Sequence, residues 1–134
     1  MDGRTQTRWW GVALDAKDPP TLVRFYAEVL GWEVANVDEK GGALGMPGAP
    51  AFVSVQYSES YVPPTWPPAP GHQQMMLHLD VAVDDLDAAV AHALRLGARL
   101  SEFQPQDDVR VLLDPEGHPF CLYHDSSPED PPPV

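Results

Sequence analysis

The chain of 134 residues carries 20 acidic and 8 basic residues, a formal charge of −12 at pH 7. This length fits one domain, and the charge argues against nucleic acid or an anionic membrane as a partner, because both select basic surfaces. A single cysteine, Cys121, excludes an internal disulfide framework, and no apolar run approaches the length of a membrane span. We therefore expect a cytoplasmic protein.

The first half of the chain has the pattern β-α-β-β-β. Trp9–Asp15 (WWGVALD) is a short apolar run typical of a buried strand. Asp18 and Pro19 are suited to begin a helix whose apolar residues recur at helical spacing and which ends at Gly31. Further strands are predicted over residues 32–37, 43–46 and 52–57.

The second half repeats this pattern after a proline-rich linker, residues 60–73. Met75–Val83 alternates as a strand, Asp84 is the expected N-cap of a helix that ends at Gly97, and strands follow over 99–103, 109–113 and 119–123. An offset of 66 residues superimposes Asp18 on Asp84. The sequence thus predicts one domain, 8–124, of two paired copies: module one (8–59) and module two (74–124), with disordered tails at 1–7 and 125–134.

Strand alternation predicts which side chains face a cavity between the paired sheets. If His78 faces this cavity, Asp80 does too, and the other strands contribute further candidates of the same orientation: Trp9, Phe52, Ser54, Gln56, Cys121 and Tyr123. Aromatic walls with a few polar groups are typical of a small-molecule pocket. Trp66, in the linker segment PPTWPP, either covers this cavity, packs at a dimer interface or anchors the linker to its own domain.

His78 and Asp80 could act together as a catalytic base and its carboxylate partner. Two positions apart on one strand, they share a face but need not touch, so a structural role for both is the alternative. Cys121 has no neighbour in the sequence that would lower its pKa, so we interpret it as a small buried residue rather than a nucleophile.

Four segments in order resemble the vicinal oxygen chelate superfamily, which includes glyoxalase I, extradiol dioxygenases and the fosfomycin and bleomycin resistance proteins: FYAEVLGWEV (25–34), HLDVAVDDLDAAV (78–90), LGAR (96–99) and DPEGHPFCL (114–122). The resemblance covers about residues 8–124 and is strongest to the small glyoxalase-like branch. It implies an α+β fold in which two βαβββ modules form a cupped, incomplete barrel, usually within a homodimer.

The resemblance also implies four metal-ligand positions, which fall on Gly11, on or near Gln56, on His78 and on Cys121. Only His78 is a strong ligand type, because glycine has no side chain, an amide binds weakly and the thiol would have to ionise. We therefore expect no cofactor and no catalytic divalent metal, although another histidine such as His118 could intrude.

Three functions remain open. The first, which we favour, is metal-free binding of a small organic molecule in the cup of a homodimer. The second is an enzyme of lyase, isomerase or dioxygenase type that uses His78 as an acid or base, or with an atypical metal. The third is an interaction module that keeps the fold without the chemistry.

Overall fold

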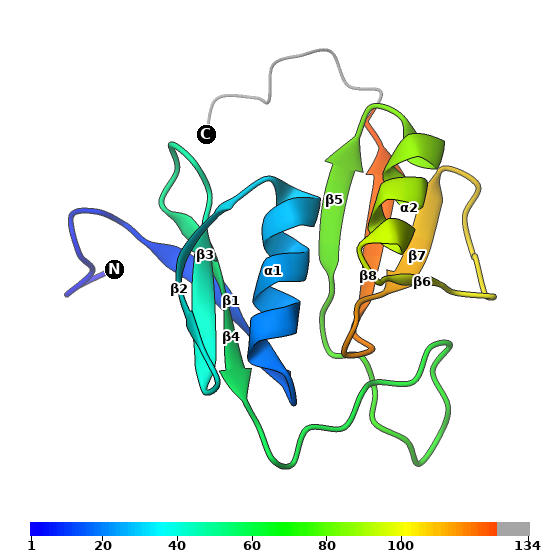
Figure 1. Ribbon diagram of the computed structural model, residues 1–134, viewed down its shortest axis with the longest axis horizontal. Helices are drawn as coiled ribbons and strands as arrows, with labels where there is room; N and C mark the ends of the chain where they lie inside the picture. The colour runs from blue at the N-terminus through cyan, green and yellow to red at the C-terminus, as the bar shows by residue number, and fades with distance from the viewer. Residues whose placement is uncertain (126–134) are drawn as a thin grey trace.

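The computed structural model describes residues 1–125 and shows two modules joined by a long linker (Figure 1). Each module is a strand, a helix and three further strands, as the sequence predicts. Module one contains β1 (Trp10–Ala16), α1 (Pro19–Leu30), β2 (Glu33–Asp38), β3 (Gly41–Gly45) and β4 (Ala51–Tyr57). Module two contains β5 (Leu79–Val83), α2 (Leu86–Arg95), β6 (Arg99–Leu100), β7 (Val109–Leu113) and β8 (Pro119–His124).

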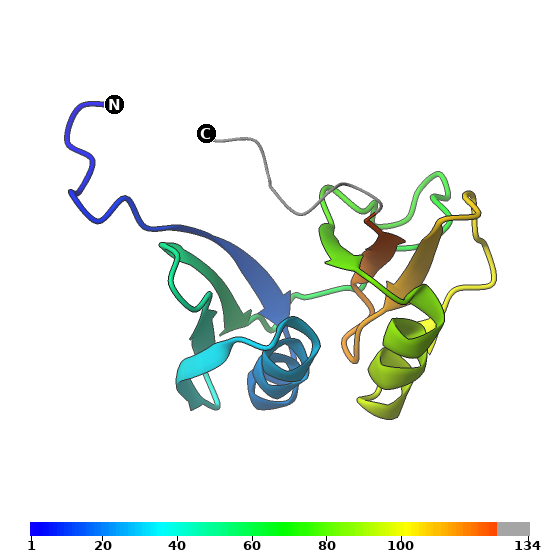
Figure 2. The ribbon, with the colours of Figure 1, turned by 90° about the horizontal axis from the view of Figure 1, so that it is seen from above.

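The two modules have the same sheet topology. Their four-stranded sheets have the orders β1-β4-β3-β2 and β5-β8-β7-β6. In each, the first strand pairs in parallel with the last and the other pairs are antiparallel. Both helices lie on the same side of the two sheets, as Figure 2 shows, and within residues 1–125 the strands form no closed barrel. The predicted α+β fold of two βαβββ modules is confirmed.

Helix α1 begins and ends at the residues that the sequence predicts. The carboxylate of Asp18 accepts hydrogen bonds from the backbone N–H and the hydroxyl of Thr21, at 3.3 and 2.7 Å. Pro19, the first residue of the helix, has no N–H that would need a partner there. Gly31 closes the helix with φ 66°, a left-handed conformation that glycine adopts without steric cost.

Helix α2 begins one residue later than predicted. The carboxylate of Asp85, rather than Asp84, accepts the hydrogen bond from the Ala88 N–H at 2.9 Å. The N-caps Asp18 and Asp85 are therefore 67 positions apart, and this offset, not 66, relates the strands of the two modules.

Two strands of module two are shorter than predicted. The strand expected over Met75–Val83 begins only at Leu79, so His78 lies just before β5. The strand expected over 99–103 ends at Leu100.

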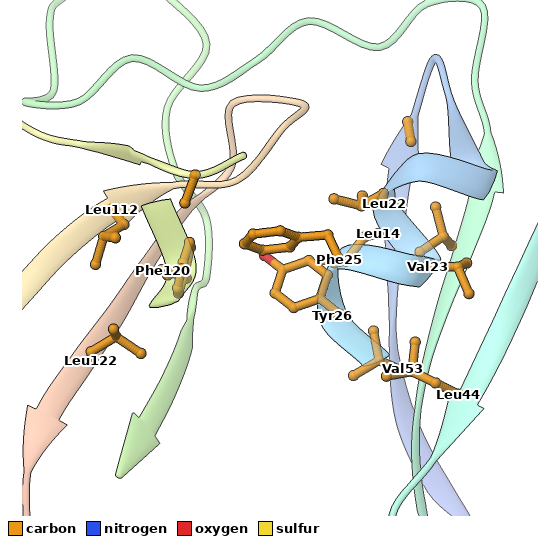
Figure 3. Close-up of a cluster of buried hydrophobic side chains, with 14 residues drawn as sticks. Leu14, Leu22, Val23, Phe25, Tyr26, Leu44, Val53, Leu112, Phe120 and Leu122 are labelled. Carbon is orange, nitrogen blue, oxygen red and sulfur yellow. The ribbon is translucent and has the colours of Figure 1, made fainter. Parts of the chain in front are cut away.

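The hydrophobic core joins the modules through α1. Phe25 and Tyr26 point from α1 towards Phe120 of β8 (Figure 3). Their rings meet that of Phe120 edge to face, with centroid distances of 5.8 and 6.1 Å. All three side chains are buried, and aromatic pairs of this geometry stabilise a fold by about 0.5–1.5 kcal/mol beyond the area that they bury.

A buried hydrogen-bond network lies beside this core and also links the modules. Asp114, in the turn between β7 and β8, is fully buried. Its carboxylate accepts a hydrogen bond from the Tyr26 hydroxyl at 2.7 Å and contacts Nδ1 of His118 at 2.8 Å. The same carboxylate accepts the backbone N–H groups of Glu116 and His118, at 2.9 and 3.0 Å. His118 therefore has a structural role.

The turn 114–117 also contacts the start of α1. The carboxylate of Glu116 accepts the backbone N–H groups of Lys17 and Asp18, at 3.0 and 2.8 Å. Tyr61 of the linker donates its hydroxyl proton to the Glu116 carbonyl at 2.9 Å and stacks on the His118 ring. We call the contacts of turn 114–118 with Tyr26, Lys17, Asp18 and Tyr61 the clasp.

Outside the modules the chain makes few regular contacts. Residues 1–8 contain turns and are exposed, and the linker pairs with itself once, where the Thr65 N–H donates to the Gln73 carbonyl at 2.9 Å. Asp125 still bonds to the Val83 carbonyl, and the remainder of the predicted C-terminal tail, 126–134, lies outside the described residues. Within the described part of the chain, neither helix has the length and apolar character needed to span a bilayer.

Candidate functional site

Three polar side chains of module two converge at the start of β5. His78 precedes the strand, Asp80 lies on it, and Cys121 of β8 stands opposite Asp80 in the parallel pairing. His78 Nε2 is 3.0 Å from Asp80 Oδ1. One donor atom from each of the three side chains lies within 4.8 Å of the others. His78 and Asp80 therefore not only share a face but also touch.

Burial and charge hold Cys121 in its neutral form. Desolvation is the main cause that raises the thiol pKa, followed by the negative charge of Asp80 and a hydrogen bond to its carboxylate. Together they raise the pKa of Cys121 to about 11. A thiol in this environment is a poor nucleophile near neutral pH, in agreement with the sequence-based interpretation.

The cluster stands at the junction of two adjoining cavities, which share His78, Gln106, Val109 and Cys121. The apolar lobe has a volume of about 150 Å³ and is closed by apolar side chains: Trp66, Met75, Pro105, Val111 and Pro119. The polar lobe, of about 360 Å³, is completed by hydrogen-bonding side chains: Asp80, Asp108, Tyr123 and His124. Neither lobe is lined by a lysine or an arginine.

Trp66 is anchored on module two and at the same time forms a wall of the apolar lobe. Its indole N–H donates to the Phe103 carbonyl at 3.4 Å, and the two rings are 5.9 Å apart. The anchoring role considered from the sequence is thus seen in the structure, together with a place in the cavity that includes His78.

The candidates from module one lie apart from this cavity. Trp9, Phe52, Ser54 and Gln56 line neither lobe. Gln56 donates its amide N–H to Asp15 at 2.7 Å, and Ser54 donates to the Val12 carbonyl at 3.4 Å. Phe52 packs against Trp9 and lines another apolar cavity, of about 290 Å³ between β1 and β5, which Asp80 lines as well. The two-lobed cavity itself brings together only the predicted residues of module two and the linker.

The pairing registers correct one equivalence between the modules. Ala13 pairs with Ser54 as Asp80 pairs with Cys121, and the two pairs are related by the offset of 67. The module-one counterpart of Cys121 is therefore Ser54, whereas Gln56 corresponds to Tyr123. By the same offset Asp15 corresponds to Ala82, and Asp80 to Ala13.

The family positions do not fit a divalent ion held between the modules. They carry Gly11, Ser54, His78 and Cys121, of which only His78, and Cys121 once its thiol has ionised, offer a strong donor. The space beside Gly11 is also filled, because a Cβ atom there would lie 2.5 Å from the Phe52 carbonyl oxygen and 2.6 Å from its ring. A histidine at that position would require the strand pair β1–β4 to move. His118 does not enter, since it is held by Asp114.

Sequence reasoning missed the loop that completes the cavity. Gln106 and Asp108 precede β7 and line the polar lobe, and His124, predicted as surface or structural, lines it as well. No periodic pattern marks residues 101–108, so nothing in the sequence indicated which of them would turn towards the cluster.

The comparisons with known proteins identify the family and the fold. Residues 11–123 match the model of the Glyoxalase-like domain family. No curated protein matches the sequence. Among solved structures, a glyoxalase/bleomycin resistance protein/dioxygenase family enzyme from Burkholderia phytofirmans PsJN is similar at 19% identity and TM-score 0.65, covering 85% of this chain and 95% of its own.

Two other solved structures have the same fold at low identity. The fosfomycin resistance protein FosX from Mesorhizobium loti is similar at 13% identity and TM-score 0.63, over 87% of this chain and 91% of its own. A glyoxalase/bleomycin resistance protein from Albidiferax ferrireducens T118 is similar at 17% identity and TM-score 0.61, over 87% and 98%. At such identities the likeness concerns the fold alone.

Proposed function

Because this chain belongs to the glyoxalase-like domain family of the vicinal oxygen chelate superfamily, we propose that it binds a small organic molecule in the two-lobed cavity of module two. The observation that carries the proposal is the junction itself, where an apolar lobe and a polar lobe meet at His78 and Cys121. The proposed binding needs no divalent ion bridging the modules, because Gly11 and Ser54 provide no second pair of strong donors.

The lining favours an amphiphilic ligand. The apolar part of such a ligand would lie against Trp66, Met75 and Val111, and its polar end would reach Asp80 and Asp108. A pocket with mostly apolar walls and a few convergent polar groups is the usual form of a small-molecule site. Two acidic groups in a lobe that no lysine or arginine lines favour hydrogen-bond donors over anions at the polar end.

Saturation-transfer NMR with a library of small amphiphilic fragments tests this proposal on the full chain. We expect fragments that bind the wild type to lose at least tenfold in affinity in Gln106→Trp, because this exposed residue borders both lobes and an indole there fills their mouth. Asp107→Trp, at the neighbouring exposed position outside both lobes, is the matched control and should bind normally. Equal binding by both variants would contradict the proposal.

A proton-transfer enzyme is the second candidate, and the contact between His78 and Asp80 favours it. A carboxylate 3.0 Å from Nε2 can accept a hydrogen bond from it and orient the ring, which leaves Nδ1 to exchange a proton with a ligand. In D2O, the wild type should catalyse deuterium exchange at an acidic C–H of a bound fragment, and His78→Gln should bind the fragment without exchange. Equal exchange in both proteins would exclude this role.

We also propose a homodimer, since several large apolar side chains of the single chain are exposed. Among them are Trp10, Tyr57, Met76 and Leu77, with exposed fractions of 59%, 52%, 86% and 62%. The single unpaired thiol is compatible with a reducing compartment such as the cytoplasm.

A further inference from the structure

We propose that His78, Asp80 and Cys121 form a three-ligand site for a thiophilic transition-metal ion of the zinc class, contained within module two. The site goes beyond the proposed ligand binding, with which it shares the cavity. It differs from a metal centre with ligands from both modules, because module one contributes no donor. The mismatch at Gly11 and Ser54 excludes the bridging ion but leaves this local donor set intact.

The geometry suits one small ion. Zinc binds imidazole nitrogen, carboxylate oxygen and thiolate sulfur at about 2.0–2.3 Å, so the donor atoms around a tetrahedral ion lie less than about 4 Å apart. The three donor atoms here lie within 4.8 Å of one another, and two of them are already 3.0 Å apart. The pairing of Asp80 with Cys121 fixes the backbones of two of the three ligands, so the set would need mainly side-chain rotations to reach coordination distance.

The donor types select the class of ion. Magnesium and calcium prefer oxygen ligands, whereas a nitrogen, oxygen and sulfur set suits zinc and its spectroscopic substitute cobalt(II). Three protein ligands leave a fourth position for water or a bound molecule, as in catalytic rather than structural zinc sites. A bound molecule in the polar lobe, which His78 and Cys121 line, would supply that fourth ligand.

Proton release gives the site a defined pH dependence. The titratable groups around Cys121 are His78 and Asp80 from the β5 side, Asp108 from the loop before β7, and Tyr123 and His124 on β8. The ion binds the thiolate, so binding displaces the thiol proton and should strengthen as the pH rises.

Titration of the chelator-treated full chain with cobalt(II), under a non-coordinating reductant, tests the site. We expect one ion per chain, a thiolate-to-cobalt charge-transfer band, the intense visible bands of four-coordinate cobalt, and displacement by one equivalent of zinc. Cys121→Ser should abolish the charge-transfer band, and Asp80→Asn and His78→Gln should each weaken binding at least tenfold. His124→Gln, which alters the same cavity outside the cluster, should bind as the wild type does.

Three results would overturn the proposal: no charge-transfer band at saturation, a band that Asp80→Asn and His78→Gln leave unchanged, or one ion for every two chains. Circular dichroism identifies any variant that fails to fold, and the near-isosteric Asp80→Asn keeps the test decisive if Cys121→Ser is lost. Fragment binding by the chelator-treated wild type tests the proposed ligand binding separately, so the two proposals can fail independently.

Discussion

Asp114 is the one charged side chain that is fully buried among residues 1–125. A buried carboxylate is strongly destabilising unless hydrogen bonds replace its hydration. Here two backbone N–H groups, the His118 ring and the Tyr26 hydroxyl surround it. Burial, reinforced by the charge and hydrogen bond of Asp114, raises the pKa of Tyr26 well above its usual value. The hydroxyl therefore stays protonated and remains a hydrogen-bond donor to Asp114.

Tyr26→Phe should lower the free energy of unfolding by about 1–3 kcal/mol, because the carboxylate loses one of its donors while it stays buried. Urea denaturation followed by circular dichroism measures the change. Tyr57→Phe is the control, since that ring is 52% exposed and a change there should stay within about 0.5 kcal/mol. A similarly small loss for Tyr26→Phe would mean that the other donors satisfy Asp114 without Tyr26.

At this scale the sequence placed residues 114–117 between two predicted strands but did not indicate their partner in the fold. The segments FYAEVLGWEV and DPEGHPFCL were each recognisable, yet their contact through Tyr26 and Asp114 spans 88 positions. The cluster at His78 was predictable only in part, because strand alternation gives a common face and no distances. The contact of His78 with Asp80 depends on the side-chain rotamers.

At the scale of the elements, helix caps decide where each helix begins. DD at positions 84 and 85 offers two equally good N-cap residues, and spacing alone does not choose between them. In the structure the backbone of Asp85 is extended, with φ −129° and ψ 102°, and its side chain bonds to Ala88.

Asp85→Ala should therefore destabilise the protein by about 0.5–2 kcal/mol, whereas Asp84→Ala should change stability by less than about 0.5 kcal/mol. Thermal and urea unfolding of the two variants make the comparison, each serving as the control for the other. The reverse order would place the N-cap at Asp84 and restore the offset of 66 between the copies.

The two shortened strands have local causes that alternation does not reveal. Leu79 pairs with Phe120, so extension of β5 to His78 would pair it with Pro119, which has no N–H to donate. Beyond Leu100, the side-chain amide of Gln104 occupies the edge of β7. It accepts the Val111 N–H at 2.9 Å and donates to the Val111 carbonyl at 2.9 Å. The Gln104 side chain thus makes the hydrogen bonds to β7 that a longer β6 would make.

For the whole molecule, the exposed apolar side chains bear most directly on assembly. Met76 and Leu77 adjoin each other between the linker and β5, and large apolar side chains at such exposure are typical of association surfaces. The sequence could not indicate this surface, because it predicts the faces of strands and not what covers the residues between them.

Sedimentation equilibrium should give about twice the chain mass of 14.7 kDa. The double variant Met76→Lys, Leu77→Lys should shift the protein towards the monomer, since burying two ammonium groups in an interface is unfavourable. Leu94→Lys is the control: this α2 residue is 41% exposed, and the variant should remain dimeric. A wild type that stays monomeric at all concentrations would contradict the proposed homodimer.

The clasp joins helix α1 of module one to a turn of module two, and the sequence provides no equivalent contact between α2 and the corresponding turn of module one. Counted from the N-caps, the residue of α2 equivalent to Tyr26 is Ala93, and the turn of module one that corresponds to 114–118 reads MPGAP (46–50), without a carboxylate. Two copies of one ancestral unit can in principle pair with themselves as readily as with each other. Only module one carries the tyrosine, Tyr26, and only module two carries the buried carboxylate, Asp114. Module one can therefore form the clasp with module two but not with another copy of module one. The divergence of the duplicated copies has thus made their pairing heterotypic.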